Sequence, residues 1–189
     1  MKILRTFDEQ YQGVYLACFV DCSIYKTPEE YETELDKIQD LFQDPFYVRS
    51  FIKSSQSGWK KGKFKNDPLN FLAKDTLEET ADLFDRLDEI IESSQDGNCF
   101  DLLFDNFKGL SSKENYNDPG RRKMYTYEHD SLLRLYGVIL SNNCIILTGA
   151  GIKLVDAMQD SDALQLELDK MDYLIKWLEK NNITDCSDF

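Results

Sequence analysis

One arginine interrupts the most apolar segment of the chain, residues 132–140 (LLRLYGVIL). A guanidinium is costly to place among apolar side chains unless an acid pairs with it or its head reaches an edge. Two interpretations of Arg134 are therefore open. The first is a structural ion pair, which is the commoner fate of a buried arginine. The second is a binding site for a phosphate group, which matches the planar fork of the guanidinium.

A second cation, Lys153, closes the next apolar segment, residues 144–153 (CIILTGAGIK), which follows after the polar tripeptide SNN. Asparagine tolerates positive φ and bonds its own backbone, so the two segments predict a β-hairpin. In simple register, Arg134 and Lys153 lie near the same end of the sheet. Gly149 and Gly151 predict a bulge or tight bend, and whether the cations share a face depends on it. The glycines match neither the dinucleotide spacing nor a Gly-Lys-Ser/Thr pattern, so we reject a phosphate loop.

Both hairpin segments are apolar on alternate positions and on most positions between them, which predicts central strands covered on both faces. An earlier β-rich segment is also apolar on both faces and is expected to join the same sheet. We therefore predict an α+β fold with a small antiparallel sheet packed with N-terminal and C-terminal helices. The expected strands lie near residues 13–21, 124–128, 132–140 and 144–153.

Helices are expected on both sides of the hairpin in the sequence. Thr27 and Pro28 predict a helix start, because threonine caps helices and proline suits the first helical position. The longest helix is expected over residues 75–93 and the last over residues 160–179, each with one apolar stripe. Residues 99–107 predict one more short helix.

The chain length of 189 residues suits a single domain, 1–189. In this domain, residues 1–107 are expected to be mainly helical after a first strand, and residues 108–180 hold the hairpin and the last helix. Hydrophobic residues make up 42% of the chain and aromatic residues 13%, which excludes a disordered chain. No apolar run approaches the roughly 18 residues of a membrane span, and the N-terminus does not match a signal peptide. We therefore expect a cytoplasmic protein.

The net charge is -13, from 35 acidic and 22 basic residues. This charge disfavours non-specific binding to nucleic acid and fits a basic partner. The basic residues gather locally, since residues 108–153 hold seven Lys and Arg against four Asp and Glu. Residues 53–66 form a second basic segment, in which lysines interleave with Trp59 and Phe64. It is either a patch for nucleic acid or an acidic partner, or a solvated loop whose aromatic residues plug the core edge, which is the commoner case.

Five cysteines at irregular spacing and a single histidine, His129, form no zinc-site pattern. We expect no metal, no cofactor, and free thiols. A lone histidine in a loop is weak support for a catalytic cysteine–histidine pair.

Several stretches together resemble an uncharacterised family of bacterial proteins of about this length. They are YLACFVD, LEETADLFDRLDEI, CFDLLFDNFKGL and LLRLYGVILSNNCIILTGAGIKLVDAMQD. The C-terminal half is also similar to the RelE/ParE superfamily of toxin–antitoxin toxins, over roughly 50 residues. The similarity rests on Arg-Leu-Tyr in one strand and on a following strand that ends in Lys153.

The RelE/ParE resemblance implies a small antiparallel sheet with packed helices and ribosome-dependent cleavage of mRNA. In such a reaction, cationic side chains bind the scissile phosphate and a Tyr, Lys or His moves protons. It also implies a small antitoxin protein as partner, and the ribosome with its mRNA. The implied catalytic residues are Arg134, Lys153 and Tyr136, and the implied substrate-binding residues are Arg121, Arg122 and Lys123.

The chain departs from those toxins in charge, since they are usually basic and this chain is acidic. It also lacks their basic C-terminal end. The alternative function is therefore a non-enzymatic interaction module of the same fold that binds a basic protein partner through its acidic helices.

Overall fold

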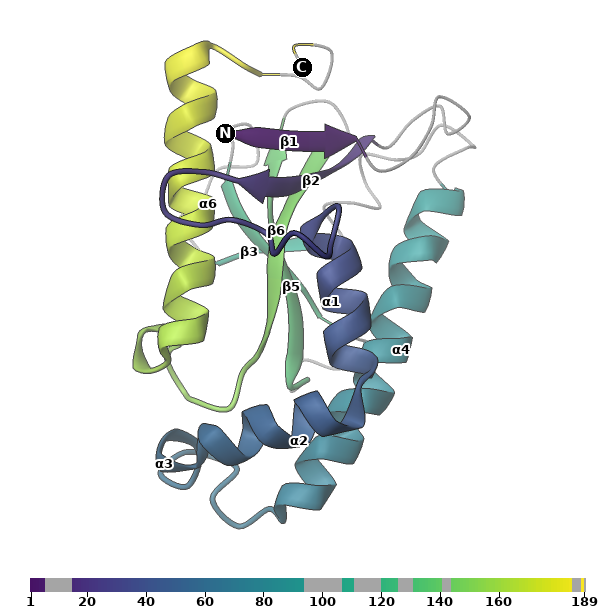
Figure 1. The fold of residues 1–189 in the computed structure, drawn as a ribbon, viewed down its shortest axis with the longest axis vertical. Coiled ribbons are helices and arrows are strands. Elements are labelled where there is room, and N and C mark those ends of the chain that lie inside the picture. Colours follow the sequence, from purple (N-terminus) through teal and green to yellow (C-terminus); the bar gives the residue numbers. More distant parts are fainter. Residues whose placement is uncertain are drawn as a thin grey trace.

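The structure is a computed structural model that describes residues 1–5, 15–93, 107–110, 120–125, 131–140, 144–184 and 188. Within these ranges, the strands form one six-stranded sheet in the order β1-β2-β6-β5-β4-β3, with helices on both faces (Figure 1). The strands are β1 (Lys2–Arg5), β2 (Tyr15–Asp21), β3 (Phe107–Gly109), β4 (Gly120–Tyr125), β5 (Leu133–Leu140) and β6 (Cys144–Ile152). The helices are α1 (Glu34–Gln43), α2 (Pro45–Ser54), α3 (Gln56–Trp59), α4 (Leu69–Ser93), the 3-10 turn η2 (Met158–Asp160) and α6 (Asp162–Asn181).

The hairpin of β5 and β6 is the centre of the sheet, as its apolar pattern predicts. Every residue of β5 is buried, and β6 is buried except at Ala150, which is half-buried. Alternate residues of β5 serve two cores. Leu135 and Ile139 pack with α1, α2 and α4 on one face, and Val138 and Leu140 pack with α6 on the other.

The α+β class is confirmed, but the prediction of a small antiparallel sheet is wrong in two respects. Within the described ranges the sheet has six strands, and β2 pairs with β6 in parallel. The parallel pairing follows from the long connection between the two strands, which runs through α1 to α4 and then β3 to β5 before β6 lies beside β2 in the same direction. Residue periodicity does not reveal such a crossover.

The expected helix start at Thr27 and Pro28 is also wrong, because α1 begins at Glu34. Thr33 caps this helix: its hydroxyl accepts from the Asp36 backbone N–H at 3.2 Å, and the Asp36 carboxylate accepts from the Thr33 N–H at 2.9 Å. Thr27 instead donates its hydroxyl hydrogen to Glu34 Oε1 at 2.7 Å. The capping box at Thr33 starts the helix, and Thr27 uses its hydroxyl for a buried tertiary hydrogen bond.

Two strand boundaries differ from expectation. Phe107, expected at the end of a helix, begins the edge strand β3 and pairs with Met124 of β4. The strand expected at 124–128 lies earlier, as β4 (Gly120–Tyr125), and residues 126–128 lie outside the described ranges.

The cysteine prediction holds only in part. Cys18 and Cys22 are buried and are not part of a disulfide, but Cys144 is disulfide-bonded. His129, Cys99 and Cys186 lie outside the described ranges. Among the helices of the described ranges, none combines the length and apolarity that crossing a membrane requires.

Candidate anion-binding site

A β-bulge in β6 decides which face of the sheet carries Lys153. β5 and β6 pair Tyr136 with Gly149 and then Gly137 with Leu147, so Thr148 is an extra residue on β6. An extra residue in one strand reverses the alternation of side chains beyond it. The glycines of the sequence TGAG predict a bulge in this region, and the register places it at Thr148.

The residues of β6 beyond the bulge are consequently reversed in direction. Ile146, before the bulge, packs on the α6 side, and so does Gly151, where an added Cβ would lie 2.6 Å from Leu164 of α6. Lys153 lies two positions after Gly151 and continues the ladder, donating its backbone N–H to Leu132 O at 2.7 Å. The bulge therefore puts Lys153 on the same face as Arg134, which pairs with Gly151 in register.

Three cations from consecutive strands line one cavity of about 250 Å³ on this face. Lys123 comes from β4, Arg134 from β5 and Lys153 from the end of β6, and we call these three residues and their cavity the cationic pocket. Its walls are completed by Leu110, Met158, Gln159 and Leu168. Arg134 is 7% exposed, so the pocket reaches the buried end of its side chain.

The electrostatics of the cationic pocket favour an anion. Burial lowers the pKa of Lys153, and the nearby positive charges of Arg134, Lys123 and Lys63 lower it further, against the opposing carboxylate of Asp156. A lowered lysine pKa means that its positive charge is disfavoured where it stands. A bound phosphate would relieve that repulsion, and it would accept hydrogen bonds from the guanidinium and both ammonium groups.

Glu79 of α4 fixes the start of the strand that carries Arg134. Its two carboxylate oxygens accept from the backbone N–H groups of Leu132 and Leu133 at 2.9 and 2.7 Å. Burial raises the pKa of Glu79 to about 7, although these two bonds and the charge of Arg134 oppose the rise. This anchor holds the pocket end of β5 against α4.

The other predicted site residues do not all reach the cationic pocket. Tyr136 is on the same face but is fully buried beneath α6 and does not line the cavity. Arg121 and Arg122 pair with Val138 and Gly137 in register, and their side chains lie outside what the structure describes. Of the six predicted residues, the structure thus brings together Lys123, Arg134 and Lys153. Lys63, whose charge acts on Lys153, is not among the predicted site residues, although it belongs to the basic segment 53–66.

A second group of charged residues, which the sequence analysis missed, is buried where α1 meets α6. The Glu34–Lys170 cluster consists of Tyr25, Thr27, Glu34, Lys37, Glu167 and Lys170. Glu34 Oε1 accepts from Tyr25 and Thr27 at 2.6 and 2.7 Å, and Oε2 accepts from Lys37 and Lys170 at 2.6 and 3.1 Å.

The two acids of this cluster differ in environment. Burial raises the pKa of Glu34, but the ammonium groups of Lys170 and Lys37 and its hydrogen bonds bring it below its usual range. Glu167 accepts from Lys170 through Oε1 at 2.8 Å, while Oε2 is buried and lacks a donor. Burial consequently raises the pKa of Glu167 to about 7. The signal for this cluster was a Glu and a Lys three positions apart within the apolar face of the last helix.

No group of three His, Cys, Asp or Glu residues suited to a metal ion occurs in the described part of the chain. The chain matches no family model, no curated protein and no solved structure in the comparisons made with it.

Proposed function

We propose that this chain is a RelE/ParE-like toxin component whose cationic pocket binds a phosphodiester group of RNA. The observation that carries the proposal is the convergence of Lys123, Arg134 and Lys153 in one cavity, which depends on the bulge at Thr148. Arg134 and Lys153 are the two residues that match the basic strand positions of that superfamily. The antiparallel order of β4, β5 and β6 is compatible with the sheet that the resemblance implies.

The proposed reaction is cleavage of the RNA backbone by its own 2′-hydroxyl. The 2′-oxygen forms a bond to phosphorus and the bond to the 5′-oxygen breaks, leaving a 2′,3′-cyclic phosphate and a 5′-hydroxyl. Arg134 and Lys123 stabilise the negative charge on the phosphate oxygens. Lys153 gives a proton to the leaving 5′-oxygen, which its lowered pKa favours, and the proton of the 2′-hydroxyl goes to water.

In this proposal, Tyr136 is a positioning residue, in contrast to the catalytic role that the resemblance implies. Its ring lies under α6 beside Gly151, where an added Cβ would be 3.5 Å from Tyr136 Cε2. Tyr136 is also the register partner of Lys123. It packs beside the cavity without lining it, and so helps to hold β4 and β5, which carry Lys123 and Arg134, in position.

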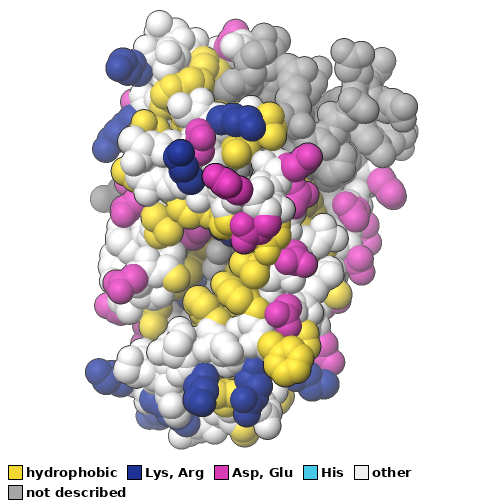
Figure 2. Space-filling view, viewed as in Figure 1, with side chains coloured by type: hydrophobic (Ala, Val, Ile, Leu, Met, Phe, Trp, Pro, Cys, Tyr) yellow, Lys and Arg dark blue, Asp and Glu magenta, His cyan; other side chains and the backbone are white. Residues whose placement is uncertain are grey.

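The alternative is a non-enzymatic module that binds a basic protein, and the outward face of α4 supports it. Six acids on this face are exposed: Glu78, Asp82, Asp85, Asp88, Glu89 and Glu92. Acidic side chains are also prominent along the α4 side of the molecule (Figure 2). Burial raises the pKa of Asp88, and the neighbouring charges of Glu92 and Asp85 raise it further. A small antitoxin with a basic segment would suit the same face.

Induced expression in bacteria tests the proposed function. We expect growth arrest with cleaved mRNA for the wild type, and normal growth for Arg134→Ala, Lys123→Ala and Lys153→Ala at equal protein levels. Lys176→Ala is the matched control, because Lys176 is an exposed lysine on α6. Normal growth and intact mRNA with the wild-type protein would contradict the proposed RNA-cleaving activity. The non-enzymatic interaction module would then be the remaining proposal.

A further inference from the structure

We propose that the lysine-rich loop after α3 is a second phosphate-binding surface, continuous with the cationic pocket, and that the ligand is a single strand of RNA lying across both. We call Lys60, Lys61, Lys63 and Lys65, with the backbone of residues 60–66, the basic loop. The inference rests on the proposed function, since it extends the ligand of the same pocket.

The basic loop lies against the segment that follows Lys153, although about 90 positions separate them in sequence. An added Cβ at Gly62 would lie 3.5 Å from the Asp156 carboxylate, and one at Gly58 would lie 3.0 Å from Val155. Lys63 is near enough to Lys153 for its charge to lower the pKa of Lys153. Lys63 therefore links the two groups of cations.

The core holds the basic loop in place. Trp59 is fully buried and donates its indole N–H to Ile52 O at 3.0 Å, and Phe64 packs against the core from the other end of the loop. Lys60 Nζ lies 4.3 Å from the centroid of the Trp59 ring, and Lys63 Nζ lies 4.6 Å from that of Phe64. The prediction that the aromatic residues plug the core edge is confirmed, and this anchoring also gives the lysines a fixed position.

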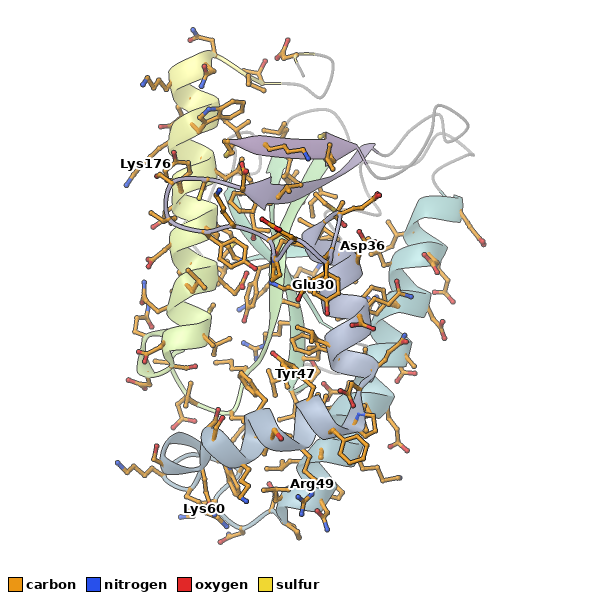
Figure 3. All side chains as sticks on the ribbon, viewed as in Figure 1. Glu30, Asp36, Tyr47, Arg49, Lys60 and Lys176 are labelled. Carbon is orange, nitrogen blue, oxygen red and sulfur yellow. The ribbon has the colours of Figure 1, made fainter. Side chains whose placement is uncertain are left out.

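The lysines of the basic loop face solvent together. All four are exposed. Lys and Arg side chains gather at the lower end of the molecule in Figure 2, where Figure 1 places α3 and Figure 3 labels Lys60. A fixed group of surface ammonium groups attracts a polyanion, and each neutralised phosphate releases a counterion.

The small size of the cationic pocket favours an extended single strand as the ligand. A cavity of about 250 Å³ holds one phosphate and part of its sugars, so the neighbouring nucleotides must lie on the surface outside it. On the side of Lys153, that surface leads to Lys63. The six exposed acids of α4 repel a polyanion from that side of the molecule, although one acid, Asp156, lies beside Gly62 on the path itself. An acidic protein segment is the competing ligand.

Two RNA probes distinguish binding at the basic loop from binding in the cationic pocket. The first is an RNA dinucleotide, which has one phosphodiester, and the second is an unstructured 12-nucleotide RNA. Their dissociation constants are measured between 50 and 200 mM salt for the wild type and for Lys60→Ala/Lys61→Ala/Lys65→Ala, which keeps Lys63 because its charge acts on Lys153 in the pocket. The control is Lys74→Ala/Lys176→Ala/Lys180→Ala, which removes three exposed lysines elsewhere. Figure 3 places Lys176 near the end of the molecule opposite Lys60.

We expect the loop variant to bind the 12-nucleotide RNA roughly tenfold or more weakly at the low-salt end. Its salt slope should fall by about 2, since each lost contact to a single strand is worth about 0.7. The dinucleotide should bind the loop variant and the wild type within about twofold of each other, and the control variant should match the wild type on both probes.

The inference about the basic loop would be overturned if the loop variant and the wild type bound the 12-nucleotide RNA with equal affinities and salt slopes. If both still bound the dinucleotide, the proposed function would stand. A wild type that does not bind the dinucleotide would overturn the pocket and hence the proposed function. Full displacement of the longer RNA by polyglutamate of the same length, at equal concentration, would show that an acidic protein is the ligand and overturn the RNA assignment.

Discussion

The Lys170 ammonium lies 3.1 Å from Glu34 Oε2, 136 positions earlier in the chain, and neither side chain is exposed to solvent. This pair joins α1 to α6 although the two helices pack in different cores. They can meet because β2 pairs with β6 only over residues 144–147, so no strand of the described ranges covers the later part of β6 on that side. The pair therefore links α1 to α6 beside the part of β6 that does not pair with β2.

Replacing Lys170 should be strongly destabilising. Lys170→Met leaves Glu167 without its ammonium partner and removes one of the donors to Glu34, so two buried carboxylates lose compensation. Breaking a buried pair in this way costs about 3–5 kcal/mol. Urea unfolding of the wild type and the variant measures the loss. The control is Lys74→Met, which removes the exposed Lys74–Glu78 bridge of 2.8 Å and should leave the unfolding midpoint unchanged. Equal losses in the two variants would contradict the role given to the buried pair.

Glu167 should make the protein less stable as the pH rises. Its folded-state pKa of about 7 is above the ordinary 4.5, so the folded protein keeps a proton that the unfolded chain releases. The corresponding stability is complete below about pH 4.5 and is lost as the pH rises to about 7. The interval corresponds to on the order of 3 kcal/mol.

Glu167→Gln isolates this effect, since the amide cannot ionise. The free energy of unfolding, measured in urea at pH 5, 6, 7 and 8, should fall less with pH in the variant than in the wild type. Glu79→Gln should act in the same direction, because burial also raises the pKa of Glu79 to about 7. Parallel curves for the wild type and the Glu167 variant would show that Glu167 is already ionised at pH 5.

Gly149 should not tolerate a side chain while Glu167 is present. An added Cβ would overlap Glu167 Oε2 and lie 2.5 Å from Lys170 Nζ. We expect Gly149→Ala to cost about 1–3 kcal/mol, as overpacking of a core does. The closest clash is with the Glu167 carboxylate, so Gly149→Ala should cost less in a Glu167→Ala background, in which only the contact with Lys170 remains. Double-mutant analysis by urea unfolding measures this coupling, and additive losses would contradict it.

The sequence predicts the centre of the fold better than its edges. Residues 132–140 and 144–153 are recognised as central strands because both alternating sets of positions are apolar. β2 is recognised near residues 13–21 as a strand of the same sheet, but its parallel pairing with β6 is not, and the edge strand β3 is not recognised at all. Both pairings depend on long connections and on contacts remote in sequence. Thr27 and Thr33 show the same limit locally. Both are plausible helix caps, and the sequence alone does not decide which one starts the helix.

The candidate site was predictable as a set of residue types and not as a geometry. The sequence indicates Arg134 and Lys153 as candidate site residues because they are cations in apolar strands. Their shared face depends on one extra residue, Thr148, and no local pattern distinguishes it from its neighbours. The contribution of Lys63 depends on a loop that folds back from about 90 positions away. The burial of Tyr136 depends on how closely α6 approaches the sheet.

The most direct test of the cationic pocket is an NMR titration of the Lys153 side-chain amine, without and with an RNA dinucleotide. Free protein should show a Lys153 pKa below the ordinary 10.5, because burial and the charges of Arg134, Lys123 and Lys63 lower it. Arg134→Gln should raise that pKa by removing a neighbouring positive charge, whereas Lys176→Gln should not. Bound dinucleotide should raise the pKa in the wild type, since its phosphate stabilises the ammonium form. A Lys153 that titrates at its ordinary value, unmoved by Arg134→Gln and by the dinucleotide, would contradict the account.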